Sequence, residues 1–208
     1  MFDGHYTDWR IKRFDKIISI FGEEFFKDKT MLELGAGFGE NGKMFEELGA
    51  KVTYAEARKE HLDVLLERNS QTETILLDQD RSWNLNRKFD IIIHWGVLYH
   101  LNNWKQDLTC ALSHSNLIFL ESEVCRSNNP NLEIKQYECG YDQAINNIGS
   151  RPSAIMIENY LTSLGCKIDR YDDAELNSSF HTYNWSVPTP SPEDYIEGYR
   201  RFWIIRNE

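Results

Sequence analysis

A chain of 208 residues with 41% hydrophobic residues is long enough to bury one complete core, so we expect a single domain over residues 1–208. Its formal net charge of −10 argues against nucleic acid as a partner, because affinity for phosphates comes from lysine and arginine. No apolar run approaches the roughly 20 residues needed to cross a bilayer. The N-terminus lacks the basic, apolar and small-residue order of a secretory signal, and the cysteines lack the close spacing of zinc sites. We therefore expect a cytoplasmic protein with no membrane partner and no metal ion.

Apolar spacing along the chain alternates between the helical period and the short runs typical of strands. Residues 8–21 show helical spacing, and this helix belongs to an N-terminal helical segment over residues 1–28. Beyond it, strands are expected at 30–34, 52–55, 74–77, 89–93, 117–120, 166–171 and 201–206, and helices at 39–48, 59–68, 103–112 and 152–164. The alternation predicts an α/β fold with a doubly wound, mostly parallel sheet of seven strands.

Two segments fall outside this alternation. Residues 123–150 are polar, irregular and rich in asparagine, and an insertion at this point would cover the carboxyl ends of the strands. We interpret them as a substrate lid. Residues 186–192 hold a proline at every second position, which favours extended polyproline geometry over sheet or helix. Between these segments, Pro152 is expected to open the helix 152–164.

A glycine-rich turn follows the first predicted strand. Because Gly35, Gly37 and Gly39 lack side chains, the backbone can turn sharply there and approach a ligand closely, beside the start of the next helix. Glu33 adds a carboxylate able to engage a cationic amine, which a pyrophosphate site has no reason to contain. The combination favours a ligand that carries an amino acid group.

A dinucleotide site is the rival interpretation, because residues 37–42 formally satisfy the G-x-G-x-x-G pattern. That fingerprint should begin directly after the strand, at Gly35, and its sixth position would then be Glu40, an acid facing phosphate oxygens. A purely structural glycine turn is the other alternative.

The sequence from Glu33 to Gly39 resembles the first motif of class I methyltransferases, and the resemblance to that superfamily extends over nearly the whole chain. It implies a Rossmann-like methyltransferase fold, with S-adenosyl-L-methionine as cofactor and S-adenosyl-L-homocysteine as product. In that family the turn holds the methionine part of the cofactor, which assigns Gly35, Ala36 and Gly37 to cofactor binding.

Acidic residues follow the second and third predicted strands. Glu56 ends the second strand, where a carboxylate can accept two hydrogen bonds from ribose hydroxyls, and Ala57 follows it in the cofactor site. A solvated charge at a strand end is the alternative for Glu56. The resemblance places an acidic residue after the third strand against adenine, and this residue is Asp78 or else Asp80. A hydrophilic loop explains both aspartates nearly as well.

Histidines and aromatic residues crowd the end of the fourth predicted strand, in residues 94–101. We assign Trp95 and Gly96 to the edge of the cofactor site. A histidine titrates near neutral pH, so His100 is suited to accept a proton as the methyl group transfers, with a structural histidine as the equal alternative. Glu121 and Glu123, beyond the fifth strand, are the next candidate bases.

Residues 96–100, 8–13 and 151–165 resemble segments of the bacterial tRNA wobble-uridine carboxymethyltransferases. That resemblance implies contacts of Arg10 and Tyr99 with cofactor or substrate. We assign Arg10 to cofactor binding and Tyr99, together with His100, to the catalytic group.

Two further sets of side chains have both a functional and a structural interpretation. Basic residues of the first helix could hold an anion or form its wet face: Arg10, Lys12, Arg13 and Lys16. Aromatic residues of the later chain could wall an apolar pocket or simply pack a long loop: Tyr137, Tyr141, Tyr183 and Trp185.

These features predict methyl transfer from S-adenosylmethionine to an oxygen or nitrogen of a small-molecule acceptor. The alternatives are a tRNA-modifying (carboxy)methyltransferase, a nicotinamide-dependent oxidoreductase and a non-catalytic cofactor-binding module, because one fold hosts many activities.

Overall fold

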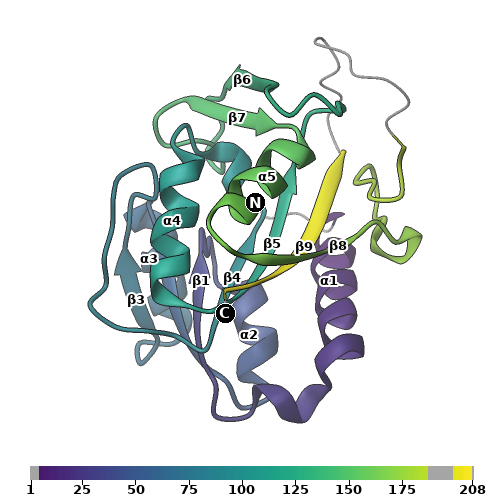
Figure 1. Cartoon of the computed structure of the whole chain (residues 1–208). Helices are drawn as coiled ribbons and strands as arrows, with labels where there is room; N and C mark the ends of the chain where they lie inside the picture. The colour runs from purple at the N-terminus through teal and green to yellow at the C-terminus, as the bar shows by residue number, and fades with distance from the viewer. Residues whose placement is uncertain (1–4, 187–198, 208) are drawn as a thin grey trace.

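The computed structural model describes residues 5–186 and 199–207 and is built around a seven-stranded sheet with helices on both faces (Figure 1). The strands of this sheet are Thr30–Leu34 (β1), Lys51–Glu56 (β2), Glu73–Leu76 (β3), Ile91–Trp95 (β4), Leu117–Glu123 (β5), Lys167–Tyr171 (β8) and Arg200–Arg206 (β9). The α-helices are His5–Phe21 (α1), Glu40–Glu46 (α2), Lys59–Arg68 (α3), Trp104–His114 (α4) and Ala154–Ser163 (α5). Three short 3₁₀ helices complete the described helices: Glu23–Phe26 (η1), Leu98–His100 (η2) and Ala174–Leu176 (η3).

The order of strands across the sheet is β3-β2-β1-β4-β5-β9-β8. The pairings among β1 to β5 are parallel, whereas β9 runs antiparallel to both β5 and β8. The chain therefore steps outward from β1 to β3 and then returns to place β4 on the other side of β1. Sheets of this kind bind ligands at such a switch point, outside the carboxyl ends of the strands. The predicted doubly wound, mostly parallel seven-stranded fold is confirmed.

The alternation of side chains along the strands divides the hydrophobic core between the two faces of the sheet. Ile92 belongs to a cluster that includes Leu108 of α4 and Ile157 of α5. Its neighbours Ile91 and Ile93 belong to a second cluster, formed with residues of α1, α2 and α3. All five residues of β4 are buried, as the continuous apolar run predicts.

The predicted lid segment is more regular than its composition suggests. Strand β5 extends to Glu123, and Glu133–Tyr137 (β6) pairs antiparallel with Ile148–Pro152 (β7) in a separate two-stranded sheet. Strand β6 has no fully buried face, so its sequence lacks the apolar alternation that signals a strand. Figure 1 shows this β6–β7 hairpin above one end of the main sheet.

Two expectations about the later chain concern Pro152 and the proline-rich segment. Pro152 ends β7 and does not open α5, because Ser153 is the N-cap residue and its side chain accepts a hydrogen bond from the Met156 N–H. Most of the predicted polyproline segment, residues 187–192, lies outside the described residues. In the part of the chain that the structure describes, no helix is long and apolar enough to cross a membrane.

Candidate active site

The glycine turn between β1 and α2 has the backbone conformation that its sequence predicts. Gly35, Gly37 and Gly39 all have positive φ, with values of 64°, 55° and 75°. A side chain at Gly35 would also collide with its surroundings, since a Cβ there would lie 2.5 Å from Cγ2 of Val97. The turn is therefore packed directly against the segment that follows β4, and only glycine fits.

Glu33 does not lie where we predicted. Glu33 is 1% exposed, and its carboxyl group accepts hydrogen bonds from the Asn41 side chain at 2.9 Å and from the Gly42 N–H at 2.8 Å, so it secures the start of α2. Burial raises the pKa of Glu33 to about 8, although both hydrogen bonds act in the opposite direction. Glu33 does not border the cavity described below, and its role in this structure is to hold α2 in place next to the glycine turn.

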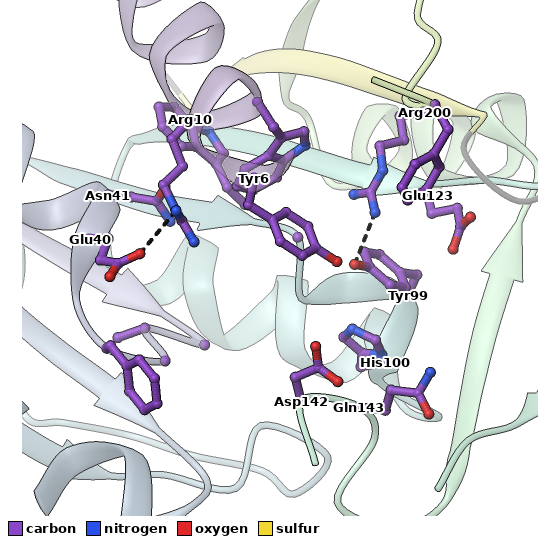
Figure 2. Close-up of a pocket in the computed structure, with 18 of the residues that line it drawn as sticks. Tyr6, Arg10, Glu40, Asn41, Tyr99, His100, Glu123, Asp142, Gln143 and Arg200 are labelled. Atoms are coloured by element: carbon purple, nitrogen blue, oxygen red, sulfur yellow. Dashed lines mark hydrogen bonds and ion pairs between the residues drawn. The ribbon is translucent and has the colours of Figure 1, made fainter. Parts of the chain in front are cut away.

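A cavity of two joined chambers lies at the switch point of the sheet. The larger chamber has a volume of about 310 Å³ and the smaller one about 100 Å³. The two share Gly35, Gly37, Gly96, His100, Asp142 and Gln143. Asp142 and Gln143 come from the loop between β6 and β7, so the hairpin forms part of the wall. Figure 2 shows the larger chamber, with Arg10 and Glu40 on one side and Tyr99, His100 and Arg200 on the other.

Glu56, Ala57 and Asp78, which the sequence assigns to the cofactor, all border the smaller chamber. Glu56 accepts hydrogen bonds from the Gly37 N–H at 2.9 Å and the Arg58 N–H at 3.0 Å. Burial alone would raise the pKa of Glu56, but the hydrogen bonds from His61 and from these amides outweigh it and lower the pKa. The carboxylate is therefore ionised and able to accept hydrogen bonds at neutral pH.

The structure also separates Asp78 from Asp80. Asp78 borders the smaller chamber, with Arg81 at 3.0 Å from its carboxylate. Asp80 instead accepts hydrogen bonds from the Asn103 N–H at 2.8 Å and from Asn146 at 3.1 Å, and it lines neither chamber. Of the two alternatives, Asp78 is the one in position to meet a ligand.

Arg10, Trp95 and Gly96 border the larger chamber together with the glycine turn. Arg10 forms an ion pair with Glu40 at 2.9 Å, which holds its guanidinium beside the turn. The indole nitrogen of Trp95 is buried without a hydrogen-bond partner among the described residues. This side of the chamber therefore offers both charge and an unused donor.

The opposite side of the larger chamber is built on buried ion pairs. Tyr99 accepts a hydrogen bond from Arg200 at 3.1 Å, and Arg200 pairs with Glu121 at 3.2 Å. Burial raises the pKa of Tyr99, with Arg200 acting in the opposite direction, so the phenol stays protonated at neutral pH. Glu123 borders the chamber and pairs with Arg151 at 3.3 Å, whereas Glu121 is fully buried and lines neither chamber. Of these two candidate bases, only Glu123 meets the cavity.

His100 borders both chambers and is fixed by a residue that the sequence did not single out. Its Nδ1 lies 2.6 Å from Oε2 of Glu138, which is 1% exposed. Oε1 of Glu138 lies 2.5 Å from Nη1 of Arg151, and Oε2 accepts a hydrogen bond from the Ala144 N–H at 2.9 Å. Glu138 occupies a polar loop with no recognisable motif, so only the tertiary structure identifies it.

Of the two interpretations of the later aromatic residues, the structure agrees with packing and not with a pocket wall. Tyr137 is 73% exposed on the hairpin, and Tyr141 packs against His61 with ring centroids 4.7 Å apart. Tyr183 is fully buried, and Trp185 stacks with Arg201 at 3.6 Å from the ring centroid. Neither chamber is lined by any of the four in the described structure, and the aromatic lining comes from Tyr6, Trp9, Phe38, Trp95, Tyr99 and Phe180.

The basic residues of α1 form neither a solvent-exposed helix face nor a single anion-binding site. Arg13 is fully buried, hydrogen-bonded to Tyr183 and stacked on Trp9 at 4.0 Å from the ring centroid. Lys16 pairs with Asp173 at 2.6 Å, and Lys12 donates to the Asn177 carbonyl. These contacts fasten α1 to the segment after β8, and only Arg10 of the group borders the cavity.

This fold and this cavity define a class I S-adenosylmethionine-dependent methyltransferase: a parallel sheet with antiparallel β9 between β5 and β8, and a ligand cavity over the glycine turn. A family described as a methyltransferase domain matches residues 6–187, and the chain belongs to this family. No curated protein matches its sequence significantly.

Solved structures with the same fold are distant in sequence. The N-terminal domain of EvdMO1 with S-adenosylhomocysteine bound has a TM-score of 0.67 at 15% identity, over 94% of this chain and 80% of that one. The plantazolicin methyltransferase BpumL, also in complex with S-adenosylhomocysteine, has a TM-score of 0.64 at 14% identity, over 100% and 88% of the two chains. A methyltransferase from Clostridium acetobutylicum has a TM-score of 0.62 at 12% identity, over 97% and 91%. At such identities the likeness supports the fold.

Proposed function

We propose that this methyltransferase acts on an oxygen or nitrogen of a small-molecule acceptor, and that the cofactor extends through both chambers while the acceptor lies in the larger one. The observation that carries the proposal is the position of His100, which borders both chambers and is held at 2.6 Å by a buried carboxylate. A proton acceptor fixed where the two chambers meet suits transfer to a protonated oxygen or nitrogen.

The residues around the cavity fit S-adenosylmethionine. In this proposal the adenosine lies in the smaller chamber, with Glu56 toward the ribose and Asp78 toward the adenine. The methionine part follows Gly35, Ala36 and Gly37 into the larger chamber, toward Arg10. Two described side chains bordering that chamber, Trp9 and Trp95, have buried indole N–H groups without partners, and Oδ1 of Asn41 is likewise unpaired. A zwitterionic amino acid end, which both accepts and donates hydrogen bonds, matches this set of free donors and a free acceptor.

When bound, S-adenosylmethionine supplies an electrophilic methyl carbon, which forms a bond with the acceptor's lone pair while the electron pair of the sulfur–carbon bond returns to sulfur. The protein's own part is to fix geometry, because a near-attack arrangement can lower the barrier by roughly 7 to 11 kcal/mol. Tyr99, Arg200 and Glu123 form a polar wall on the acceptor side, held by the buried ion pairs described above.

The size of the cavity supports a small acceptor. Pockets for drug-sized ligands have volumes of roughly 300 to 1,000 Å³. The larger chamber, at about 310 Å³, is at the lower end of that range and is shared between the methionine part and the acceptor. The polar wall favours an acceptor with hydroxyl or amino groups.

The first experiment is calorimetric titration with S-adenosylmethionine, S-adenosylhomocysteine and NADH, followed by an assay of methyl transfer to small hydroxylated and amino compounds. We expect saturable micromolar binding of the two sulfur compounds and methylation of at least one acceptor. Methylation of tRNA alone, with binding that weakens steeply as salt increases, would replace this proposal with the tRNA-modifying alternative. Binding of NADH alone would favour an oxidoreductase, and cofactor binding without transfer to any acceptor would favour a non-catalytic module.

A further inference from the structure

We propose that Glu138 is a positioning residue that selects the tautomer of His100, so that Nε2 of the ring takes the proton released by the acceptor. The inference rests on the proposed function and narrows its substrate class. A base of this kind serves an acceptor that arrives protonated, such as a hydroxyl or an amine, and gives no advantage to a carboxylate.

The first step of the argument is the charge of Glu138. Burial raises the pKa of this carboxyl, but the hydrogen bond and charge of His100 and the charge of Arg151 outweigh burial and lower the pKa to about 2. Glu138 is therefore a carboxylate at any working pH, and a carboxylate only accepts hydrogen bonds. The 2.6 Å contact must then be a bond donated by the Nδ1–H of His100.

The second step concerns the other nitrogen of the ring. In a neutral imidazole that carries its proton on Nδ1, the lone pair lies on Nε2. No hydrogen bond engages Nε2 in the described part of the chain, and His100 borders both chambers. Figure 2 shows His100 between Tyr99 and the Asp142–Gln143 loop. The ring thus presents a proton acceptor to the cavity and a donor to Glu138.

Charged and titratable side chains around this ring come from several elements, and all border the larger chamber or pair with Glu138. They are Tyr6 of α1, Tyr99 of η2, Glu123 of β5, Asp142 of the β6–β7 loop, Arg151 of β7 and Arg200 of β9. Tyr99 is the ring nearest to His100, with centroids 4.1 Å apart. None of these groups is hydrogen-bonded to the imidazole in the described part of the chain, whereas Glu138 is.

The third step is that Glu138 belongs to the loop between β6 and β7, not to the main sheet. The same loop is tied to the cofactor side by a hydrogen bond from Arg58 to the Gln143 carbonyl at 2.8 Å. Gly149 lets the hairpin approach closely, since a Cβ there would lie 2.5 Å from the Tyr99 carbonyl and 2.6 Å from Oε1 of Glu138. The pairing of His100 is therefore complete only when the hairpin is seated over the strand ends.

The proton balance follows from this geometry. The acceptor's oxygen or nitrogen would form the new bond to the methyl carbon, and the electron pair of the broken sulfur–carbon bond would stay on sulfur. The proton that the acceptor's O–H or N–H group loses would pass to Nε2 of His100. His100 becomes a cation opposite the Glu138 carboxylate, and Nε2 later releases the proton to water. Glu138 moves no proton at any stage.

Glu138→Gln gives a sharp test because the amide has only one oxygen. Arg151 and the Ala144 N–H both donate to Glu138, one to each oxygen, so one of them loses its acceptor in the variant. The charged Arg151 forms the stronger hydrogen bond, so it should claim the remaining oxygen and leave the NH₂ group facing Nδ1 of His100. The imidazole would then carry its proton on Nε2, which is the wrong tautomer for a base. Glu133→Gln is the matched control, since Glu133 lies on the same hairpin, is paired with Lys135 at 2.7 Å and lines neither chamber.

The first readout is ¹⁵N NMR of the imidazole nitrogens in the full chain without added ligands, with the His100 signals assigned from a His100→Asn variant. We expect Nδ1–H in the wild type and in Glu133→Gln, and Nε2–H in Glu138→Gln. The second readout is kinetic: kcat of Glu138→Gln should fall by about 10²- to 10⁴-fold, the range for loss of general-base catalysis, at unchanged affinity for S-adenosylhomocysteine.

Specific results would overturn this inference. An Nε2–H tautomer in the wild type would do so, as would a kcat for Glu138→Gln close to that of Glu133→Gln. If Glu138→Gln fails to fold, Gly149→Ala tests the same arrangement with every charge retained, and unchanged imidazole signals and kcat in that variant would contradict the close packing invoked here. Failure of the wild type to methylate any small acceptor would instead overturn the proposed function, whereas the NMR result stands independently of it.

Discussion

Glu56→Gln tests the assignment of the smaller chamber to the ribose of the cofactor. The substitution keeps the size of the side chain but removes its charge and one of its two acceptor oxygens. Both oxygens are engaged in the free protein, by the Gly37 N–H at 2.9 Å and the Arg58 N–H at 3.0 Å, which shows that the carboxylate is oriented toward the glycine turn. A hydrogen bond to a charged group contributes about 1.5 to 3 kcal/mol. Loss of one such bond to ribose should therefore weaken binding of S-adenosylhomocysteine by about 10- to 150-fold.

The assay is calorimetric titration of S-adenosylhomocysteine into the variant and into a matched control, Glu73→Gln. Glu73 also accepts a hydrogen bond at 2.8 Å, from Thr53, and also has a lowered pKa, but it lies on β3 and lines neither chamber. The control should bind as the wild type does. Circular dichroism of both variants checks that the fold is retained. Equal affinity in Glu56→Gln and Glu73→Gln would refute the ribose assignment.

Other substitutions test the supports of the site. Gly35→Ala should cost about 1 to 3 kcal/mol in stability and abolish measurable cofactor binding, because φ at this position is positive and the new Cβ would collide with Val97. Cofactor affinity within threefold of the wild type would contradict the inference that only glycine fits in this turn. Glu33 has a pKa raised to about 8 in the fold against 4.5 as its ordinary value, so the free energy of unfolding should fall as pH rises through that window. Urea unfolding at pH 5 and pH 8.5 should show a smaller fall in Glu33→Gln, and equal slopes would argue against the raised pKa. Arg13→Ala should destabilise the protein by about 3 to 5 kcal/mol in denaturant titrations, because the substitution removes one ion-pair partner of buried Glu121 and leaves a cavity between Trp9 and Tyr183. A loss under 1 kcal/mol would show that contacts other than those of Arg13 hold α1 in place.

Periodicity carried most of the information about the fold. The apolar runs near Ile91 and Leu117 mark strands that are buried on both faces, and such strands have no polar side to obscure the pattern. The hairpin strand Glu133–Tyr137 escaped prediction because it is half-exposed on both faces, and its order comes from pairing with Ile148–Pro152. A strand defined by its partner leaves little trace in its own sequence.

Residues directly after strands were the predictable part of the site. Gly35, Glu56, Asp78 and Gly96 follow or end parallel strands, and the carboxyl ends of such strands meet at one edge of the sheet. All four border the cavity for that reason. Glu33 precedes the turn by two residues, and its carboxyl group is turned toward the protein by hydrogen bonds from Asn41 and Gly42. The pattern of strands in the sequence does not predict these two contacts.

The sequence by itself determined the class of the protein: the strand and helix order, the glycine turn and the acid at the end of the second strand are local features, and local features survive in a linear pattern. Only the tertiary structure decided the side of the larger chamber that holds Tyr99 and His100. Arg200, Glu138 and Arg151 reach it from the last strand, the hairpin loop and β7, and their pairing depends on contacts between segments far apart in the chain. A buried charge needs a partner of opposite sign, but that partner can lie at any separation along the sequence. The folded structure therefore determines which partner it pairs with.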